Sequence, residues 1–268
     1  MGPMSYIHTI LSRHIPIYRE DERFTTGLYI GRFSEASLLE DLPIWHMEEK
    51  KRFRQYHVLK RRESYLMGRY AAKQAIYNRF LTNIERYSLS DICIGEGIFH
   101  FPVVSFPHYQ NLQVCISHND CYAAALAFSE HHPMGIDIEK LNGESLSSDK
   151  TESIRSLLTV TERERLVQYS TSNLELLLLY WTAKEALSKV LKTGLMTGFS
   201  LYEIDQIERE SNVWKSRFKN FPQYKALTFR VEKDAVCSIV LPRKSSLHNM
   251  EEVLDTEFSE RVETEGAR

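Results

Sequence analysis

The sequence lacks three features that would assign the protein to a special class. Its four cysteines, Cys93, Cys115, Cys121 and Cys237, form no Cys-x-x-Cys pair, and no His or Cys spacing suits zinc. The longest apolar run, residues 176–181, is far too short to cross a bilayer. The first twenty residues contain no apolar core of a secretory signal. We therefore expect a cytoplasmic protein with reduced thiols and no membrane partner.

A strong excess of charge of either sign is also missing. The 268 residues include 34 Lys and Arg against 36 Asp and Glu, which gives a net charge of −2. This balance argues against a protein that binds nucleic acid along its whole surface. The slight acidity comes from residues 246–268, which contain seven acidic and two basic residues. The rest of the chain is slightly basic.

The order of apolar patterns predicts a mixture of strands and helices. Strands are predicted at residues 28–33, 112–117, 122–128, 134–139, 199–207, 227–231 and 237–241. Helices are predicted over 48–56, 62–80 and most of 152–192, and a loop over 96–109. Thr161, with Glu164 three residues later, predicts a capping box. Because the elements do not alternate as βαβ units, the predicted class is α+β.

The segment Gly-Ile-Asp-Ile-Glu at residues 135–139 is the first candidate for chemistry. Alternate side chains of a strand point the same way, so Asp137 and Glu139 face together while Ile136 and Ile138 point into the core. Two neighbouring carboxylates repel each other unless a cation lies between them, and Mg²⁺ binds carboxylate oxygens well. An edge strand with a solvated acidic face is the alternative.

A helical segment, Trp-Thr-Ala-Lys-Glu at residues 181–185, is the second candidate. Trp181, Glu185 and Lys189 share a helix face because they lie four residues apart. Glu185 is a candidate metal ligand or general base, and Lys189 is a candidate for holding a phosphate or neutralising a leaving group. The alternative is a surface Glu–Lys pair, which contributes about 0.2–0.5 kcal/mol.

Two further clusters are less specific. The run 50–62 contains seven Lys and Arg with two aromatic residues between them, and it leads to Gly68 and Arg69. It suits phosphate groups or an acidic protein, with a nucleic-acid patch or a solvated helix face as alternatives. Ser117 and His118 end an apolar strand. Because no nucleophile-elbow glycines flank them, an anion-binding or capping histidine is favoured over a hydrolase triad.

In this order, the motifs resemble those of the larger, surfactin-synthetase-type 4′-phosphopantetheinyl transferases. The matching residues are Lys60-Arg61-Arg62, Leu66-Met67-Gly68-Arg69, Ser117-His118, Gly135-Ile136-Asp137-Ile138-Glu139, Trp181-Thr182-Ala183-Lys184-Glu185 and Lys189. The resemblance implies a monomer of two similar α+β halves in a pseudo-twofold arrangement, with the active site between them. It implies an N-terminal half over 1–133, a C-terminal half over 134–245 and an acidic tail over 246–268.

The function that this resemblance implies is transfer of the 4′-phosphopantetheine group of coenzyme A to a serine of an apo-acyl or peptidyl carrier protein. The other product is adenosine 3′,5′-bisphosphate. Asp137, Glu139 and Glu185 would match the Mg²⁺ ligands, although Mn²⁺ suits the same oxygens. Lys189 would match the lysine at the reacting phosphate, and Lys184 would match a pyrophosphate contact.

The remaining site residues follow from the same resemblance. Ser117 and His118 would contact coenzyme A near its 3′-phosphate, and Arg62 and Arg69 would hold its nucleotide end. Glu162 resembles the glutamate that helps to deprotonate the serine, so that the base is either Glu162 or Glu185.

Three positions depart from the family pattern. His100 lies in the loop that often contains Gly-Lys-Pro, Asn119 lies where serine is common, and Lys192 lies where glycine is common. These departures raise a second hypothesis, a non-catalytic homologue that binds coenzyme A or a carrier protein. A nucleic-acid binder that uses the run 50–62 is the third and least favoured hypothesis.

Overall fold

The computed structural model describes residues 6–80, 87–107, 109–141, 148–168, 173–194 and 197–247. The chain divides into two compact units. Unit 1 contains Met1–Ile17 and Glu22–Pro133, and unit 2 contains Tyr18–Asp21 and Met134–Arg268. From residue 248 onward, the predicted acidic tail lies outside the described residues.

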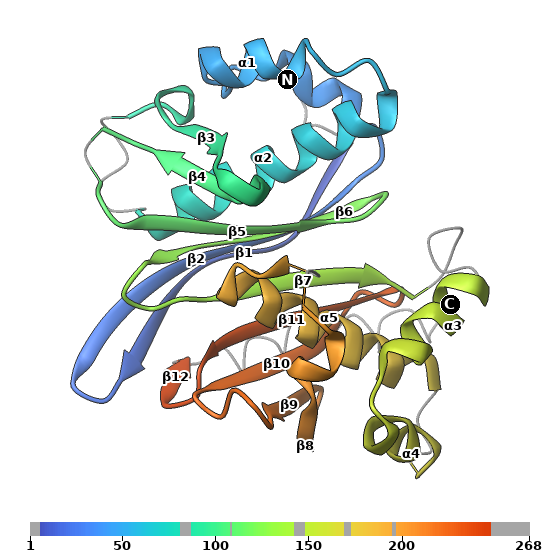
Figure 1. The fold of residues 1–268 in the computed structure, drawn as a ribbon. Coiled ribbons are helices and arrows are strands. Elements are labelled where there is room, and N and C mark those ends of the chain that lie inside the picture. Colours follow the sequence, from blue (N-terminus) through green and yellow to red (C-terminus); the bar gives the residue numbers. More distant parts are fainter. Residues whose placement is uncertain are drawn as a thin grey trace, which may run out of the picture. The chain divides into compact units, whose positions relative to one another are not determined.

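An antiparallel sheet forms the centre of unit 1 (Figure 1). Its strands lie in the order β1 (Ile7–Arg19), β2 (Glu22–Phe33), β6 (Tyr122–Ser129) and β5 (Leu112–His118). The predicted hairpin is confirmed, since Leu112 pairs with Ser129 and His118 pairs with Ala123. A small ribbon of β3 (Cys93–Glu96) and β4 (Pro102–Ser105) overlaps the region predicted as loop. Four residues per strand are too few for a visible alternation.

A long helix covers one face of this sheet. The helical elements of unit 1 are η1 (Ala36–Asp41), α1 (Met47–Phe53), α2 (Leu59–Arg79), η3 (Leu89–Asp91) and η4 (Ile98–His100). α2 lies against β2 and β6 with Ala71, Ala75 and Ile76 fully buried. A Cβ atom on Gly27 of β2 would collide with the backbone oxygen of Ala75, so the close approach of α2 depends on glycine.

Unit 2 contains a second antiparallel sheet. Its strands lie in the order β7 (Gly135–Lys140), β11 (Ala235–Pro242), β10 (Tyr224–Val231), β9 (Val213–Phe218) and β8 (Ile204–Glu210). β12 (Ser245–Leu247) is the last described strand. The hairpin predicted over residues 227–241 is confirmed by pairing of Leu227 with Ile239 and of Val231 with Ala235. The strand predicted at 199–207 begins only at Ile204.

The helices of unit 2 include one that packs against β7 and β11. They are α3 (Ser148–Leu157), α4 (Val160–Gln168), α5 (Asn173–Leu191) and the short η7 (Phe199–Tyr202). α5 contacts β7 closely because Gly135 has no Cβ, which would collide with the backbone oxygen of Ala186. Together with the sheets, these helices confirm the predicted α+β class. Among the described residues, no helix is long and apolar enough to cross a membrane.

The cap of α4 differs from the prediction. Thr159 Oγ1 accepts a hydrogen bond from the Glu162 amide at 3.3 Å, and Glu162 Oε2 accepts one from the Thr159 amide at 2.9 Å. The capping box therefore starts at Thr159, and the one predicted at Thr161 is wrong. The capping-box pattern, a Thr followed three residues later by a Glu, occurs twice, at Thr159 and at Thr161. Burial of Glu162 and Leu166 selects the earlier start.

Candidate functional site

Three carboxylates of unit 2 come from two elements that pack against each other. Asp137 and Glu139 lie on the face of β7 that contacts α5, while Ile136 and Ile138 are 0% and 1% exposed on its other face. Glu185 lies on α5, four residues after Trp181. The strand and helix predicted from the two sequence motifs thus bring these side chains into one cluster, at the contact that Gly135 permits.

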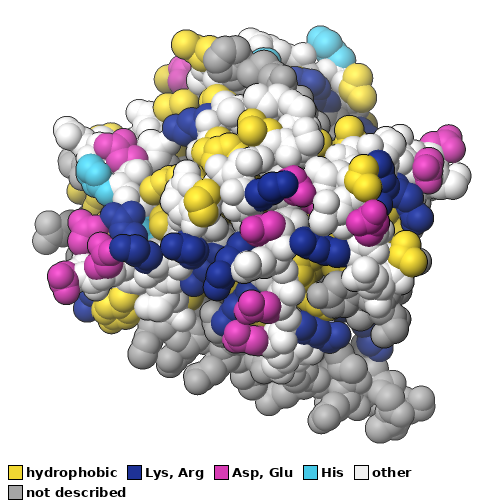
Figure 2. Space-filling view, turned by 60° about the horizontal axis from the view of Figure 1, so that its bottom comes forward, with side chains coloured by type: hydrophobic (Ala, Val, Ile, Leu, Met, Phe, Trp, Pro, Cys, Tyr) yellow, Lys and Arg dark blue, Asp and Glu magenta, His cyan; other side chains and the backbone are white. Residues whose placement is uncertain are grey.

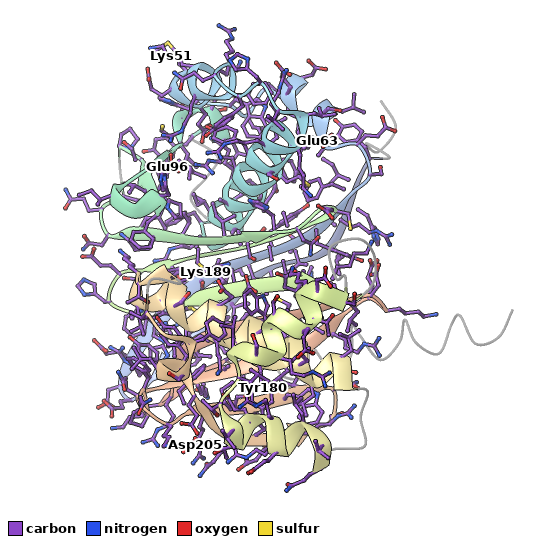
Figure 3. All side chains as sticks on the ribbon, turned by 45° about the vertical axis from the view of Figure 1, so that its right-hand side comes forward. Lys51, Glu63, Glu96, Tyr180, Lys189 and Asp205 are labelled. Carbon is purple, nitrogen blue, oxygen red and sulfur yellow. The ribbon has the colours of Figure 1, made fainter. Side chains whose placement is uncertain are left out.

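Two lysines and one indole contact these carboxylates. Lys189 Nζ, in the last turn of α5 (Figure 3), lies 2.7 Å from Asp137 Oδ1 and also donates to a carbonyl oxygen of β7. Trp181 Nε1 donates to Glu139 Oε1 at 3.2 Å, and Lys150 Nζ lies 3.3 Å from both oxygens of Glu139. Sequence reasoning missed Lys150, because no motif surrounds it at the polar start of α3.

Burial and mutual repulsion disfavour the charged forms of two of the carboxylates. Burial, together with the charges of Asp137 and Glu139, raises the pKa of Glu185 to about 7 against the opposing charges of Lys189 and Lys150. Burial and Asp137 also raise the pKa of Glu139. Glu185 Oε1 is buried and accepts no hydrogen bond from any described residue. The cluster therefore has an acceptor oxygen and negative charge that its own lysines do not fully balance.

The donor set fits a hard divalent cation, because all candidate ligands are carboxylate oxygens and one of them is a buried oxygen that lacks a donor. Within the described part of the chain, however, no three His, Cys, Asp or Glu side chains are arranged to hold a metal ion. The amines of Lys189 and Lys150 lie against Asp137 and Glu139, where a cation would bind. Cation binding would therefore require these amines to move.

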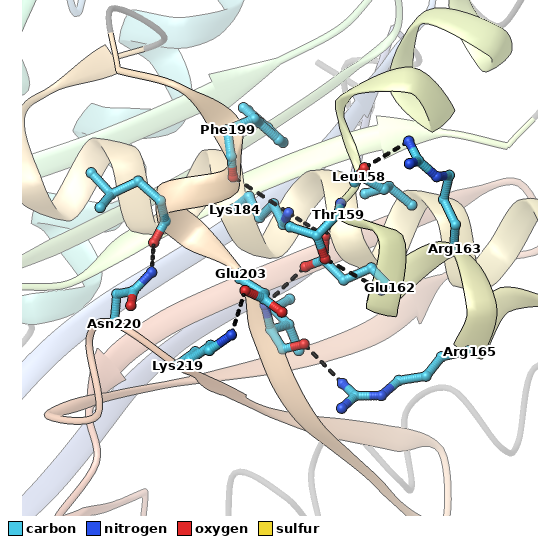
Figure 4. Close-up of polar contacts among 12 residues, drawn as sticks. Leu158, Thr159, Glu162, Arg163, Arg165, Lys184, Phe199, Glu203, Lys219 and Asn220 are labelled. Atoms are coloured by element: carbon cyan, nitrogen blue, oxygen red, sulfur yellow. Dashed lines mark hydrogen bonds and ion pairs between the residues drawn. The ribbon is translucent and has the colours of Figure 1, made fainter.

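Two other predicted site residues, Glu162 and Lys184, bind each other (Figure 4). Both are 0% exposed, and Lys184 Nζ lies 2.6 Å from Glu162 Oε2. Glu162 also accepts hydrogen bonds from the amides of Thr159 at 2.9 Å and Ile204 at 2.8 Å. The sequence did not indicate this burial, because isolated Glu and Lys residues are ordinarily exposed.

Apart from Lys184, the predicted coenzyme A contacts lie in unit 1. Ser117 is buried and His118 is exposed at the end of β5. A Cβ on Gly68 of α2 would lie 3.3 Å from His118 Cδ2, so glycine allows α2 and the end of β5 to meet. The structure thus brings together the Gly68-Arg69 and Ser117-His118 motifs.

The two predicted arginines of α2 both lie over aromatic rings. The guanidinium of Arg69 is 4.4 Å from the ring centroid of Tyr65, and its Nε is buried without a hydrogen-bond partner among the described residues. The guanidinium of Arg62 is 4.6 Å from the Phe53 ring centroid and lies 3.1 Å from a carboxylate oxygen of Glu40. Arg62 is therefore partly neutralised within unit 1.

The basic run 50–62 is also less positive in the structure than in the sequence. Lys51 lies 2.7 Å from Glu48, and Lys60 lies 2.9 Å from Asp120. On the face shown in Figure 2, Asp and Glu side chains likewise lie beside Lys and Arg side chains, although several Lys and Arg adjoin one another there. Such interleaving gives a surface of mixed sign, which is a weaker attractant for nucleic acid than a basic stripe.

Comparison with known proteins finds a family match that lies almost entirely within unit 2. Residues 133–240 match the family model of the 4′-phosphopantetheinyl transferase superfamily, and this range contains the whole carboxylate cluster. No curated protein matches the chain. Among solved structures, the Thermotoga maritima holo-[acyl-carrier-protein] synthase is similar at 19% identity and a TM-score of 0.30, over 49% of this chain and 89% of that one.

Proposed function

We propose that this protein transfers the 4′-phosphopantetheine group of coenzyme A to a serine of an apo-carrier protein. The observation that carries the proposal is the cluster of Asp137, Glu139, Glu185 and Lys189. It lies inside the range that matches the superfamily. Two short motifs, separated by more than forty residues in the sequence, meet there through direct contacts between β7 and α5.

The residues of this cluster have distinct proposed roles. Asp137, Glu139 and Glu185 would hold Mg²⁺, which when bound polarises the pyrophosphate of coenzyme A and stabilises the departing bisphosphate. Lys189 lies 2.7 Å from Asp137 in the cation-free protein. Once its amine has moved aside for the ion, it would place positive charge where the leaving oxygen becomes negative. The serine oxygen forms the new bond to phosphorus, the bond to the bisphosphate breaks, and the serine proton passes to a base.

Two glutamates are open candidates for this base. Without a cation, burial and the neighbouring carboxylates raise the pKa of Glu185 to about 7, which suits a general base, whereas a bound Mg²⁺ would lower this pKa. Glu162 is fully buried, and both of its carboxylate oxygens already accept hydrogen bonds. Glu162 is therefore hindered as the base by its own hydrogen bonds, and Glu185 by its proposed role as a Mg²⁺ ligand.

Unit 1 would bind the nucleotide end of coenzyme A. We propose contacts from Ser117, His118, Arg62 and Arg69, as the family resemblance implies, in a monomer whose two halves have the pseudo-twofold arrangement of the surfactin-synthetase-type group. Support within unit 1 comes from Gly68, which lets the helix that carries both arginines approach the end of β5.

A mass measurement tests the proposed transfer. The protein, coenzyme A and Mg²⁺ are incubated with apo-carrier proteins from fatty-acid, polyketide and peptide synthases, and each carrier is weighed intact. We expect one carrier to gain the mass of one phosphopantetheine group, and to gain nothing when EDTA replaces Mg²⁺. Failure of every carrier to gain mass, with folded protein, rejects the proposal.

A non-catalytic coenzyme A binder is the second candidate, and one loop favours it. His100, at the place of the usual Gly-Lys-Pro lysine, is exposed, and its Nδ1 lies 2.8 Å from Glu96 Oε1. Asn119, in contrast, has a local structural role, because its Oδ1 accepts hydrogen bonds from the amides of Cys121 and Tyr122 in the β5–β6 turn. Tight coenzyme A binding in calorimetry, combined with no transfer to any carrier, would establish this alternative.

A further inference from the structure

Each unit contains a buried Glu–Lys ion pair of the same construction. In unit 1, Lys73 Nζ lies 3.0 Å from Glu49, with side chains 0% and 1% exposed. In unit 2, Lys184 Nζ lies 2.6 Å from Glu162, with both side chains 0% exposed. Both glutamates close a capping box at the start of a short helix, and both lysines lie on the long helix.

The remaining hydrogen bonds of the two pairs also correspond. The second oxygen of each glutamate accepts from a backbone amide of the strand region beyond the long helix, Ile94 at 2.9 Å in unit 1 and Ile204 at 2.8 Å in unit 2. Each lysine also donates to backbone carbonyls, of Leu89 and Ile92 in unit 1 and of Phe199 in unit 2. In each unit, the ion pair and its backbone hydrogen bonds connect a short helix, the long helix and the start of a strand.

Among the described residues, a chain of contacts leads from this pair to a carboxylate cluster in unit 2 and not in unit 1. Lys184 Nζ lies 5.3 Å from the ring centroid of Phe199, and that ring stacks on Trp181 with centroids 5.2 Å apart. The Trp181 indole in turn donates to Glu139 at 3.2 Å. Lys184 also directly precedes Glu185 on α5.

We propose that Glu162 and Lys184 are positioning residues, a role that rests on the proposed function. Their ion pair holds the turn that carries Phe199 against Trp181, and so sets the carboxylates of β7 and α5 relative to each other. A carrier serine cannot reach Glu162, because this side chain has no exposed surface and three donors surround it. In unit 1 the equivalent pair joins the same kinds of element with no carboxylate cluster among its described contacts, so the construction can serve the fold alone.

Matched lysine variants test this role. Lys184→Met removes the charge but keeps the length of the side chain, and Lys73→Met does the same in unit 1. Because partners behind metal ligands set their orientation, we expect Lys184→Met to lower both Mn²⁺ affinity and kcat by about 10–100-fold. Lys73→Met, outside the cluster, should change both by less than about threefold per folded molecule. Mn²⁺ affinity is read by electron paramagnetic resonance, with no substrate present.

A double-variant cycle separates positioning from base catalysis. If the pair acts as one unit, Glu162→Gln, Lys184→Met and the double variant lose kcat to a similar extent, since such losses are not additive. If Glu162 is the base, Lys184→Met leaves the base in place, and only variants that contain Glu162→Gln lose activity. That second pattern overturns the proposal.

Two further measurements cover misfolding and failure of the transfer reaction. Phe199→Leu keeps the ion pair and breaks the ring stack, so it should lower Mn²⁺ affinity in the same direction but by less. The folded fraction is followed by circular dichroism, with trimethylamine N-oxide added to favour the folded state.

Wild-type Mn²⁺ affinity in both Phe199→Leu and Lys184→Met overturns the proposal. Absence of transfer by the wild type rejects the proposed function alone, because the Mn²⁺ comparison does not depend on turnover.

Discussion

The long helices of units 1 and 2 meet their sheets at corresponding residues. Gly27 of β2 lies against the backbone oxygen of Ala75 on α2, and Gly135 of β7 lies against that of Ala186 on α5. A buried lysine precedes each alanine by two residues, and each is paired with a capping-box glutamate. The two units thus use the same residues for close packing and for fastening the helix.

The two units differ in the charge of the side chains that lie between the long helix and the strand that contains the glycine. The pairs of corresponding residues, unit 1 first, are Tyr29 and Asp137, Gly31 and Glu139, Gln74 and Glu185, and Asn78 and Lys189. Asn78 Nδ2 donates to the Leu28 carbonyl at 2.8 Å, and Lys189 Nζ donates to the Ile136 carbonyl at 3.1 Å. These two carbonyls occupy corresponding positions on β2 and β7, which supports the pairing of residues between the two units.

A neutral ring fills the unit 1 counterpart of the cluster. Tyr29 is 1% exposed, and a Cβ on Gly31 would collide with its hydroxyl. Burial raises the pKa of Tyr29 above its ordinary value, so the ring stays neutral. The glycine–alanine contact and the buried ion pair therefore do not depend on the charged cluster, because unit 1 has both of them with uncharged residues at the corresponding positions.

Replacing Glu185 by the residue of unit 1 should have the largest effect. Glu185→Gln removes a charged ligand from the cluster, and we expect it to lower the transfer rate by about 100-fold or more. The carrier-mass assay measures this, with Gln74→Ala on α2 as the matched control at an expected change of less than about threefold. A transfer rate near that of the wild type in Glu185→Gln would remove this residue from the site.

Breaking either buried ion pair should cost similar stability in both units. Lys73→Met and Lys184→Met each leave a buried carboxylate without its cation, which typically costs about 3–5 kcal/mol. Urea denaturation of both variants measures this cost. If only one variant lost stability, the two pairs would not be equivalent, and the correspondence between the units would fail.

Glu185 of unit 2 should make the stability of the protein depend on pH, whereas the corresponding Gln74 of unit 1 should not, because glutamine does not ionise. Its pKa rises from 4.5 in the unfolded chain to about 7 in the folded protein, so folding disfavours its ionised form. Stability of the protein in EDTA should therefore fall between about pH 4.5 and pH 7, by about 2–3 kcal/mol from this group. Glu185→Gln should flatten this fall and Gln74→Ala should not, as urea titrations at several pH values can measure.

From the sequence, only those parts of the carboxylate cluster could be predicted that depend on residues close together in the chain. Alternation placed residues 135–139 on a strand, and four-residue spacing placed Trp181, Glu185 and Lys189 on one helix face, because both patterns report on neighbours in the chain. The burial of Glu162 with Lys184 depends on the distant Phe199 and Ile204, so no local pattern reports it. Lys150 was missed for the same reason, since only the fold brings it to Glu139.

The ends of the two long helices provide the smallest expected effect. Phe80, just after α2, has a φ of −113°, whereas Lys192, just after α5, has a left-handed φ of 56°. The Thr193 amide donates to the Ser188 carbonyl at 3.1 Å across this residue, which is the arrangement that usually contains glycine. Lys192→Gly should therefore stabilise the protein by up to about 1 kcal/mol. Lys192→Ala keeps the Cβ strain and should give no such gain. Thermal unfolding of the two variants measures the difference, and an equal gain in both would show that the lysine side chain, rather than the backbone, carries the cost.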